Sequence, residues 1–193
     1  MRRLMLAVLL MLLVIPLLAQ DTHKVDLFGG FQYMHAGSFD GENDSANTYG
    51  WNGSAAFHFS RYLGVAADFS GNYRSENLKF FAITGTANVH IYTYTFGPVV
   101  SWNSGGRVSP FVHTLFGGAH LRPTACVIFS GSPDECGSGS AMGFAAMVGG
   151  GVDLRLRRRL SYRLVQVDWV RLPSQFGGTN NNVRASTGLV FRF

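Results

Sequence analysis

The sequence predicts an all-β fold, an eight-stranded antiparallel up-and-down β-barrel that crosses a membrane. The final residues alternate in polarity, so that Val183, Leu189, Phe191 and Phe193 share one face of a strand. Charged residues make up 14% of the chain, whereas about 25% is usual in soluble domains. Beyond residue 20 no apolar stretch approaches the roughly 20 residues of a membrane helix. A barrel strand needs only one apolar face, which fits all three observations.

The N-terminal segment is predicted to be a cleaved signal peptide. Arg2 and Arg3 supply its positive start, and residues 4–14 form an unbroken apolar run. An uncleaved membrane anchor is the alternative, although this run is short for a spanning helix. We therefore divide the chain into a signal peptide (1–20) and one exported barrel domain (21–193).

The basic excess of the chain is modest. The formal net charge is +5 at pH 7, and two of the arginines belong to the predicted signal peptide. The remaining basic residues are dispersed along the chain, so we expect no nucleic-acid partner.

Period-two alternation predicts four strands in the first half of the domain, at 24–34, 48–60, 63–73 and 87–103. Their apolar or aromatic faces are, in order, Val25, Leu27, Phe31 and Tyr33; Tyr49, Trp51, Ala55, Phe57 and Phe59; Leu63, Val65, Ala67, Phe69 and Tyr73; and Tyr92, Tyr94, Phe96 and Trp102. Pro98 interrupts the fourth strand and predicts a bulge or a local break in pairing.

The second half predicts strands at 107–121, 140–156, 160–171 and 182–193. The fifth strand has two acceptable facings, with either Val112, Thr114 and Phe116 or Phe111, His113 and Leu115 on the lipid side. The outward faces of the sixth and seventh are Met142, Phe144, Ala146, Val148, Val152, Leu154 and Leu156, and then Val165, Val167 and Trp169. The eighth is the terminal strand described above.

The connections between these strands alternate in length. Short turns are expected at 61–62, 103–106 and 157–159, and longer polar loops at 35–47, 74–86, 122–139 and 172–181. Bacterial barrels have short periplasmic turns and longer external loops. Eight strands then place both ends of the domain on the periplasmic side. Aromatic residues also gather near the strand ends, where interfacial girdles are expected.

Two cysteines lie in the third long loop. Cys126 and Cys136 belong to an exported domain, so we expect them to form a disulfide. A metal site is the competing interpretation, but no His or Cys pair flanks them at ligand spacing. The neighbouring residues 127–129 are apolar and either pack beneath the disulfide or contact a partner.

Several segments together carry a resemblance to a known family. They are Ser109 to Val112, Gly149 to Asp153, Gln166 to Trp169 and Gly188 to Phe193. With them the whole mature chain resembles the eight-stranded outer-membrane barrels of the outer membrane protein A-like and X-like family. This resemblance implies an outer-membrane location. Because the chain ends at Phe193, we expect no periplasmic peptidoglycan-binding domain.

The terminal strand also resembles the C-terminal signal that the outer-membrane assembly machinery reads. Ser186, Gly188, Phe191 and Phe193 match its polar, glycine and aromatic positions. The resemblance therefore implies that this machinery is a partner.

The interior of an eight-stranded barrel is just wide enough for side chains to fill it. The side chains expected there form a polar set of Asp26, Gln32, Asn52, His58, Asp68, Asp153, Gln166, Asp168 and Arg184. Buried charges must be paired, so we expect a self-satisfied network that plugs the lumen. An ion path is the alternative interpretation.

The chain contains six His residues, which makes catalysis a hypothesis to examine. Some outer-membrane barrels modify lipids, and His90 or His113 with Ser101 or Asp168 would be the candidates here. No nucleophile motif accompanies them, and no motif suggests a cofactor or metal, so we expect a non-enzyme. The mid-strand run Gly149 to Gly151 precedes no helix pattern and is not a phosphate loop.

The expected role is structural or at the surface, through membrane integrity, adhesion or ligand binding at the external loops. A narrow channel and a lipid-modifying enzyme remain alternatives, as does a lipocalin-like carrier at the level of the fold. We expect a monomer that contacts outer-membrane lipid. Residues 157–159 are all arginine and form either a solvated turn or a contact to acidic headgroups.

Overall fold

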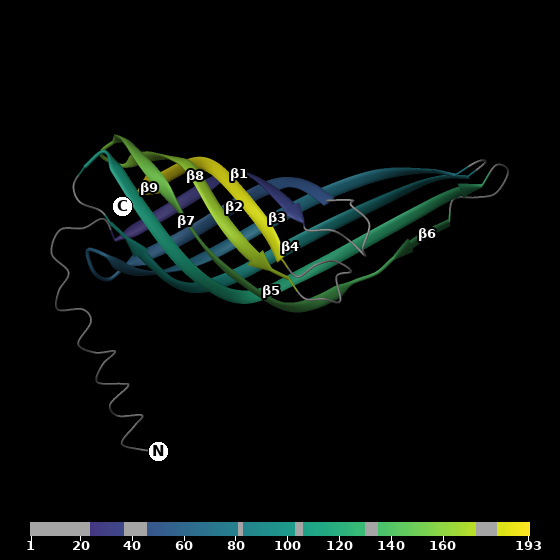
Figure 1. Ribbon diagram of the computed structural model, residues 1–193, viewed down its shortest axis with the longest axis horizontal. Helices are drawn as coiled ribbons and strands as arrows, with labels where there is room; N and C mark the ends of the chain where they lie inside the picture. The colour runs from purple at the N-terminus through teal and green to yellow at the C-terminus, as the bar shows by residue number, and fades with distance from the viewer. Residues whose placement is uncertain (1–23, 37–45, 81–82, 103–105, 130–134, 173–180) are drawn as a thin grey trace, which may run out of the picture.

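The computed structural model describes residues 24–36, 46–80, 83–102, 106–129, 135–172 and 181–193 (Figure 1). The strands are β1 (Val25–Ala36), β2 (Ala46–His58), β3 (Leu63–Phe80), β4 (Ile83–Ser101), β5 (Val108–Phe129), β6 (Glu135–Ser138), β7 (Ala141–Arg157), β8 (Leu160–Arg171) and β9 (Asn181–Arg192). No helix in this part of the chain has the length and apolar character needed to cross a membrane. The predicted signal peptide lies outside the described residues and stays a prediction.

Eight long strands close into one antiparallel barrel, which confirms the predicted fold class. The strand order is β4-β3-β2-β1-β9-β8-β7-β5, and β4 also pairs with β5. The remaining strand, β6, is short and pairs only with β5. The first and last strands meet at the seam, where Phe193 accepts a backbone hydrogen bond from Lys24 at 2.7 Å. Closure leaves no sheet edge within the barrel wall, which lipid requires.

The pairing registers fix the tilt of the strands. Starting at Tyr33, the cross-strand partners lead through β2, β3 and β4 to Arg122 on β5. In the other direction they lead through β9, β8 and β7 to Val112 on the same strand. These two residues are ten positions apart, so the shear number is ten. Eight strands with this shear tilt by about 40°.

The outer surface of the barrel wall is apolar between two aromatic girdles. When the shear is taken into account, Tyr33, Trp51, Tyr94 and Trp169 fall at nearly one height. Tyr62, Trp102 and Phe193 lie toward the end with the short turns, called the turn end below. Exposed apolar side chains such as Phe69, Phe96, Val112, Val148 and Val167 cover the surface between the girdles. The girdles are about 20 Å apart along the axis, close to the band that lipid covers.

Two predicted loops proved to be largely strand. β3 continues to Phe80 and β4 begins at Ile83, where residues 74–86 were expected to form a loop. β5 likewise continues to Phe129 and pairs there with β6. Together these strands form a sheet extension that projects from the barrel wall (Figure 1). The prediction failed because strands that stand in water need no apolar face, so their Ser, Asn and Thr content resembled a loop.

The structure also decides the two features that alternation left open. On β5, Phe111, His113 and Leu115 are buried in the lumen, whereas Val112 and Phe116 face outward. At Pro98 the ladder between β4 and β5 is interrupted, and it resumes in the same register. Because proline has no N–H to donate, a local break and not a bulge is the outcome there.

Glycines allow close strand approach at the seam between β1 and β9. A Cβ added to Gly30 would lie 2.2 Å from the Thr187 carbonyl oxygen, whereas one added to Gly29 would meet nothing within 4 Å. We predict that Gly30→Ala lowers the free energy of unfolding by about 1–3 kcal/mol through overpacking. Gly29→Ala, the neighbouring control, should change it by less than about 0.5 kcal/mol. Urea unfolding in lipid vesicles measures both, and equal effects would refute the steric argument.

Candidate functional site

A continuous polar network crosses the lumen of the barrel. Its first part lies near the turn end and centres on Arg163. The Nε of Arg163 donates to Asp153 at 2.8 Å, and its guanidinium lies 4.2 Å from the ring centroids of both Phe28 and Phe111. Arg192 donates to the same Asp153 carboxylate at 3.2 Å. This arrangement holds two buried arginines around one carboxylate.

Asp26 adds a second carboxylate to this part. Its Oδ2 lies 3.7 Å from the Arg192 Nε, and its side chain is the less buried of the two, at 19% exposure. Two aspartates therefore face two arginines, which is the charge balance that burial requires.

Gln166 joins this group to a second one deeper in the lumen. Its side-chain oxygen accepts a 2.6 Å hydrogen bond from Arg163, and its nitrogen donates to Asp168 at 2.7 Å. The amide can serve both neighbours because it carries a donor and an acceptor on one rigid group.

The second group centres on Arg184, which is 1% exposed. Its guanidinium donates to Asp68 at 2.9 Å and to Asp168 at 2.6 Å. Asn52 donates to Asp68 at 2.9 Å, and the Nε2 of His113 lies 2.9 Å from Asp168. Strands β2, β3, β5, β8 and β9 are thus tied together across the lumen by side chains alone.

Apolar side chains fill the lumen beside and beyond Arg184, toward the sheet extension. The buried residues there are Met34, Leu115, Ala119, Ala145, Met147, Val170 and Leu172. The Met147 sulfur is 3.3 Å from an Arg184 nitrogen, so the two layers touch. Thr48, Asn72, Thr93 and Asn182 are buried in the same part of the lumen, so the layer beyond Arg184 mixes apolar and uncharged polar side chains.

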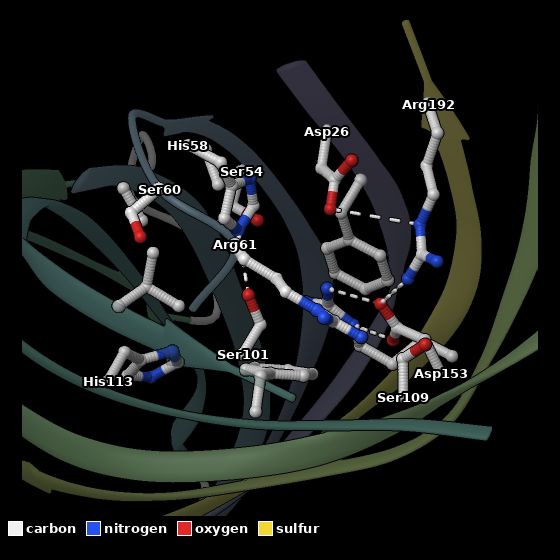
Figure 2. A pocket seen from close by; sticks show the side chains of 16 residues that line it. Asp26, Ser54, His58, Ser60, Arg61, Ser101, Ser109, His113, Asp153 and Arg192 are labelled. Atoms are coloured by element: carbon white, nitrogen blue, oxygen red, sulfur yellow. Dashed lines mark hydrogen bonds and ion pairs between the residues drawn. The ribbon is translucent and has the colours of Figure 1, made fainter. Parts of the chain in front are cut away.

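A cavity opens on the other side of the network, at the turn end (Figure 2). Arg61, His58 and Ser101 line it, and the His58 Nε2 is 2.9 Å from the Ser101 hydroxyl. The cavity is also lined by Arg163 and Phe111, the residues where the network begins. Within the described residues the lumen therefore consists of this cavity, called the vestibule below, then the charged network, then a layer of uncharged side chains.

All nine residues expected in the lumen have inward-facing side chains. Eight of them take part in the contacts above. Gln32 is 0% exposed, and neither of its amide atoms has a partner among the described residues. Their role as a plug is taken up below as a proposal.

Arg163, Arg192 and His113 belong to the network and were absent from the predicted set. Strict alternation with Val165 and Val167 would place Arg163 on the outside. A register shift between Arg163 and Gln166 inserts one extra residue in β8 and turns Arg163 inward. The adjacent apolar residues Leu164 and Val165 both face outward at this bulge, and their adjacency was the only signal in the sequence.

The candidate catalytic residues are not assembled into one site. His113 contacts Asp168 within the lumen network, while Ser101 contacts His58 in the vestibule. His90 lies on the outside of β4, with its ring 5.2 Å from that of Tyr73.

The remaining predicted features are placed as follows. Cys126 and Cys136 are cross-strand partners on β5 and β6 and are joined by a disulfide. Among the described residues no group of three or more His, Cys, Asp or Glu side chains could hold a metal ion. The side chains of 127–129 lie outside the described part. The arginines 157–159 are exposed around the turn between β7 and β8.

Of the predicted assembly signal, Ser186 faces the lumen, whereas Phe191 and Phe193 are exposed on the outer surface.

Comparisons with known proteins agree with this architecture. The chain matches the outer membrane protein beta-barrel domain family over residues 5–193. It resembles Ail, the attachment invasion locus protein of Yersinia pestis, with a TM-score of 0.61 and 18% identity over 88% of this chain and 98% of that one. That structure contains the heparin analogue sucrose octasulfate.

Two further solved barrels are similar. Neisserial surface protein A gives a TM-score of 0.54 and 16% identity, over 88% of this chain and 97% of that one. The N-terminal barrel domain of Pseudomonas aeruginosa OprF gives 0.50 and 15%, over 90% and 100%. These identities indicate the shared fold. No curated protein matched the chain.

Arg184 offers a direct test of the network. Arg184→Met leaves two buried carboxylates without their shared cation, so we expect the free energy of unfolding to fall by about 3–5 kcal/mol. Arg171→Met removes an exposed arginine at the C-terminal end of β8, on the outer face, and should change the free energy of unfolding by less than about 0.5 kcal/mol. Urea unfolding in vesicles, followed by tryptophan fluorescence, measures both variants.

Adding Asp68→Asn and Asp168→Asn to Arg184→Met should recover part of the loss, because the uncompensated charges are then removed. A loss for Arg184→Met no larger than that for Arg171→Met would contradict the network.

Proposed function

This chain belongs to the outer membrane protein β-barrel family and is an outer-membrane protein, and we propose that it acts as a closed structural barrel with a surface role. In this role the lumen does not conduct, and the sheet extension outside the membrane provides the contact surface for an extracellular ligand. The short turns of bacterial barrels face the periplasm. The vestibule therefore opens to the periplasm, and the extension stands in the extracellular medium.

The single observation that carries the proposal is the paired network around Arg184. A conducting lumen needs a continuous wet passage, whereas here Asp68 and Asp168 are held at 2.9 and 2.6 Å by one buried guanidinium. Opening a path would require breaking these contacts, and a buried charge left without its partner costs about 3–5 kcal/mol. The uncharged side chains beyond the network include Met34, Leu115 and Met147, each 1% exposed, and these buried groups would oppose ion passage even if the network moved.

The sheet extension supports the surface role. It carries strand pairing from Tyr73 outward to Phe80 on β3 and to Phe129 on β5, well beyond the upper girdle. The disulfide between Cys126 and Cys136 fixes β6 at the end of this sheet. Binding residues commonly lie on such exposed segments when a rigid scaffold positions them.

Neither alternative function has an observation of equal weight. The channel hypothesis can draw only on the vestibule, whose lining includes Arg163 and His113 but not Arg184. The enzyme hypothesis needs a histidine, a nucleophile and an orienting acid within hydrogen-bond reach. The pairs His58–Ser101 and His113–Asp168 are separate two-residue contacts. We therefore propose a non-enzymatic protein that requires no cofactor or metal.

Several further assignments belong to this proposal. Residues 1–20 would act as the export signal. Ser186, Gly188, Phe191 and Phe193 on β9 would be read by the assembly machinery. A closed barrel with an intact lipid-facing surface would work as a monomer, and its apolar outer band supports contact with membrane lipid. Nothing in the dispersed exposed charges favours nucleic acid.

Conductance tests the closed lumen. Refolded protein in a planar bilayer should give no single-channel steps, because the charged network and the uncharged side chains beyond it both block the lumen. A variant with Arg163→Ser and Arg184→Ser removes two of the three arginines of the network and should give measurable steps if it stays folded. Heat-modifiable migration on a gel confirms folding of each sample. Reproducible steps from the unsubstituted protein would overturn the proposal in favour of a narrow channel.

A further inference from the structure

A compact polar and aromatic cluster lies on the outer surface of the barrel, just beyond the extracellular girdle. We call it the rim cluster, and its members, on β2 to β5, are Trp51, Tyr73, His90, Tyr92, His120 and Arg122. All six side chains point outward because they continue the lipid-facing positions of their strands. The shear places Tyr73 and Arg122 about 6 and 12 Å beyond the girdle along the axis, which is the height of lipid headgroups.

Contacts among these side chains hold the cluster in place. The Trp51 indole donates a 3.1 Å hydrogen bond to the Tyr73 hydroxyl, and the Tyr92 ring lies edge-on to the Tyr73 ring, with centroids 6.2 Å apart. The His90 ring packs edge-on against Tyr73 and Tyr92, with centroids 5.2 and 6.5 Å away. Four aromatic rings therefore form a preorganised platform.

Arg122 supplies the permanent positive charge of the platform. It is the cross-strand partner of His90, and its charge acts on the Tyr92 phenol. Its side chain is exposed, and no carboxylate pairs with it among the described residues. The Nε2 of His120, the partner of Tyr92, is buried without a hydrogen-bond partner within the same described part.

The distribution of acidic groups explains why this charge has no counterion. Every carboxylate whose side chain is described, namely Asp26, Asp68, Asp153 and Asp168, faces the lumen. Among the described side chains, the outer surface near the rim cluster thus offers guanidinium, imidazole and phenol donors and no competing carboxylate. Such a set fits a phosphate group, since arginine donors match phosphate oxygens in charge and geometry.

We infer that the rim cluster binds the phosphate of an anionic lipid in the outer leaflet of the membrane. Arg122 contacts the phosphate oxygens, and His90 adds a hydrogen bond. The platform of Tyr73 and Tyr92 sits at the boundary with the acyl chains. The surface directly below the cluster carries Phe69, Tyr94, Phe96 and Phe116, which are 46–59% exposed. A lipid whose headgroup occupies the cluster therefore has an apolar track for its chains.

This occupant is favoured over a soluble anion by position. The cluster faces sideways from the barrel wall, where the membrane surrounds it, and not into the extracellular medium. Basic residues near a membrane surface attract anionic headgroups by this mechanism, and aromatic rings at the same height anchor the barrel there.

Native mass spectrometry of the detergent-solubilised protein, titrated with diphosphoryl lipid A, tests the inference. We expect Arg122→Gln to weaken binding about tenfold, the effect of one charge-assisted contact. Arg122→Lys should weaken it less, because a point charge remains. Arg171→Gln is the matched control. It removes one exposed arginine from the outer face of β8 near the same end, away from the rim cluster, and should change binding by less than twofold.

The second readout is lipid chemistry. Phosphatidylcholine, whose headgroup has no net charge, should bind the unsubstituted protein and Arg122→Gln equally. Gel migration shows that each variant is folded. Loss confined to the Arg122 variants supports the inference. Equal losses from Arg122→Gln and Arg171→Gln would overturn it in favour of diffuse rim charge, and an Arg122→Gln protein that binds lipid A normally would also overturn it.

Discussion

The pairing of buried charge inside the barrel is the constraint on which the rest of the structure depends. Lipid outside the wall excludes charge, so the acidic side chains of the spanning strands must point inward. In the lumen these carboxylates are poorly hydrated, so each needs a cationic partner. Arg184 on β9 satisfies this need for Asp68 on β3 and Asp168 on β8 at once. The same contacts join strands that are not all neighbours, so the network braces the barrel across its diameter while it fills the lumen.

The division between inside and outside follows from the same constraint. The carboxylates whose side chains are described all lie in the lumen. The described outer surface carries aromatic rings and a few cationic side chains near its edges. The charges in the lumen are thereby paired, whereas the rim near Arg122 is cationic and faces the surrounding membrane. A structural barrel and a lipid-contacting rim are consistent outcomes of one segregation of charge.

The sequence predicted the barrel well where one physical rule acts alone. On β2, β3 and β9 lipid faces one side and a polar lumen the other, so period-two alternation assigns both faces. On β5 the lumen side is itself apolar, with Phe111 and Leu115 buried, and alternation could not choose. The bulge at Leu164 and Val165 moved Arg163 into the lumen, and two adjacent apolar residues are a weak signal of such an insertion. The sheet extension was mistaken for loops because its strands leave the membrane and lose the apolar face on which the prediction relied.

The central claim is that the network separates the vestibule from the extracellular side of the lumen. Accessibility of single introduced cysteines to a membrane-impermeant thiol reagent tests it most directly, with the native disulfide retained. Ser54→Cys lies in the vestibule, and Asn72→Cys faces the lumen beyond Arg184. With reagent applied from the periplasmic side of oriented barrels, we expect rapid labelling of Ser54→Cys and none of Asn72→Cys. Labelling of Asn72→Cys from that side at a similar rate would contradict a closed lumen.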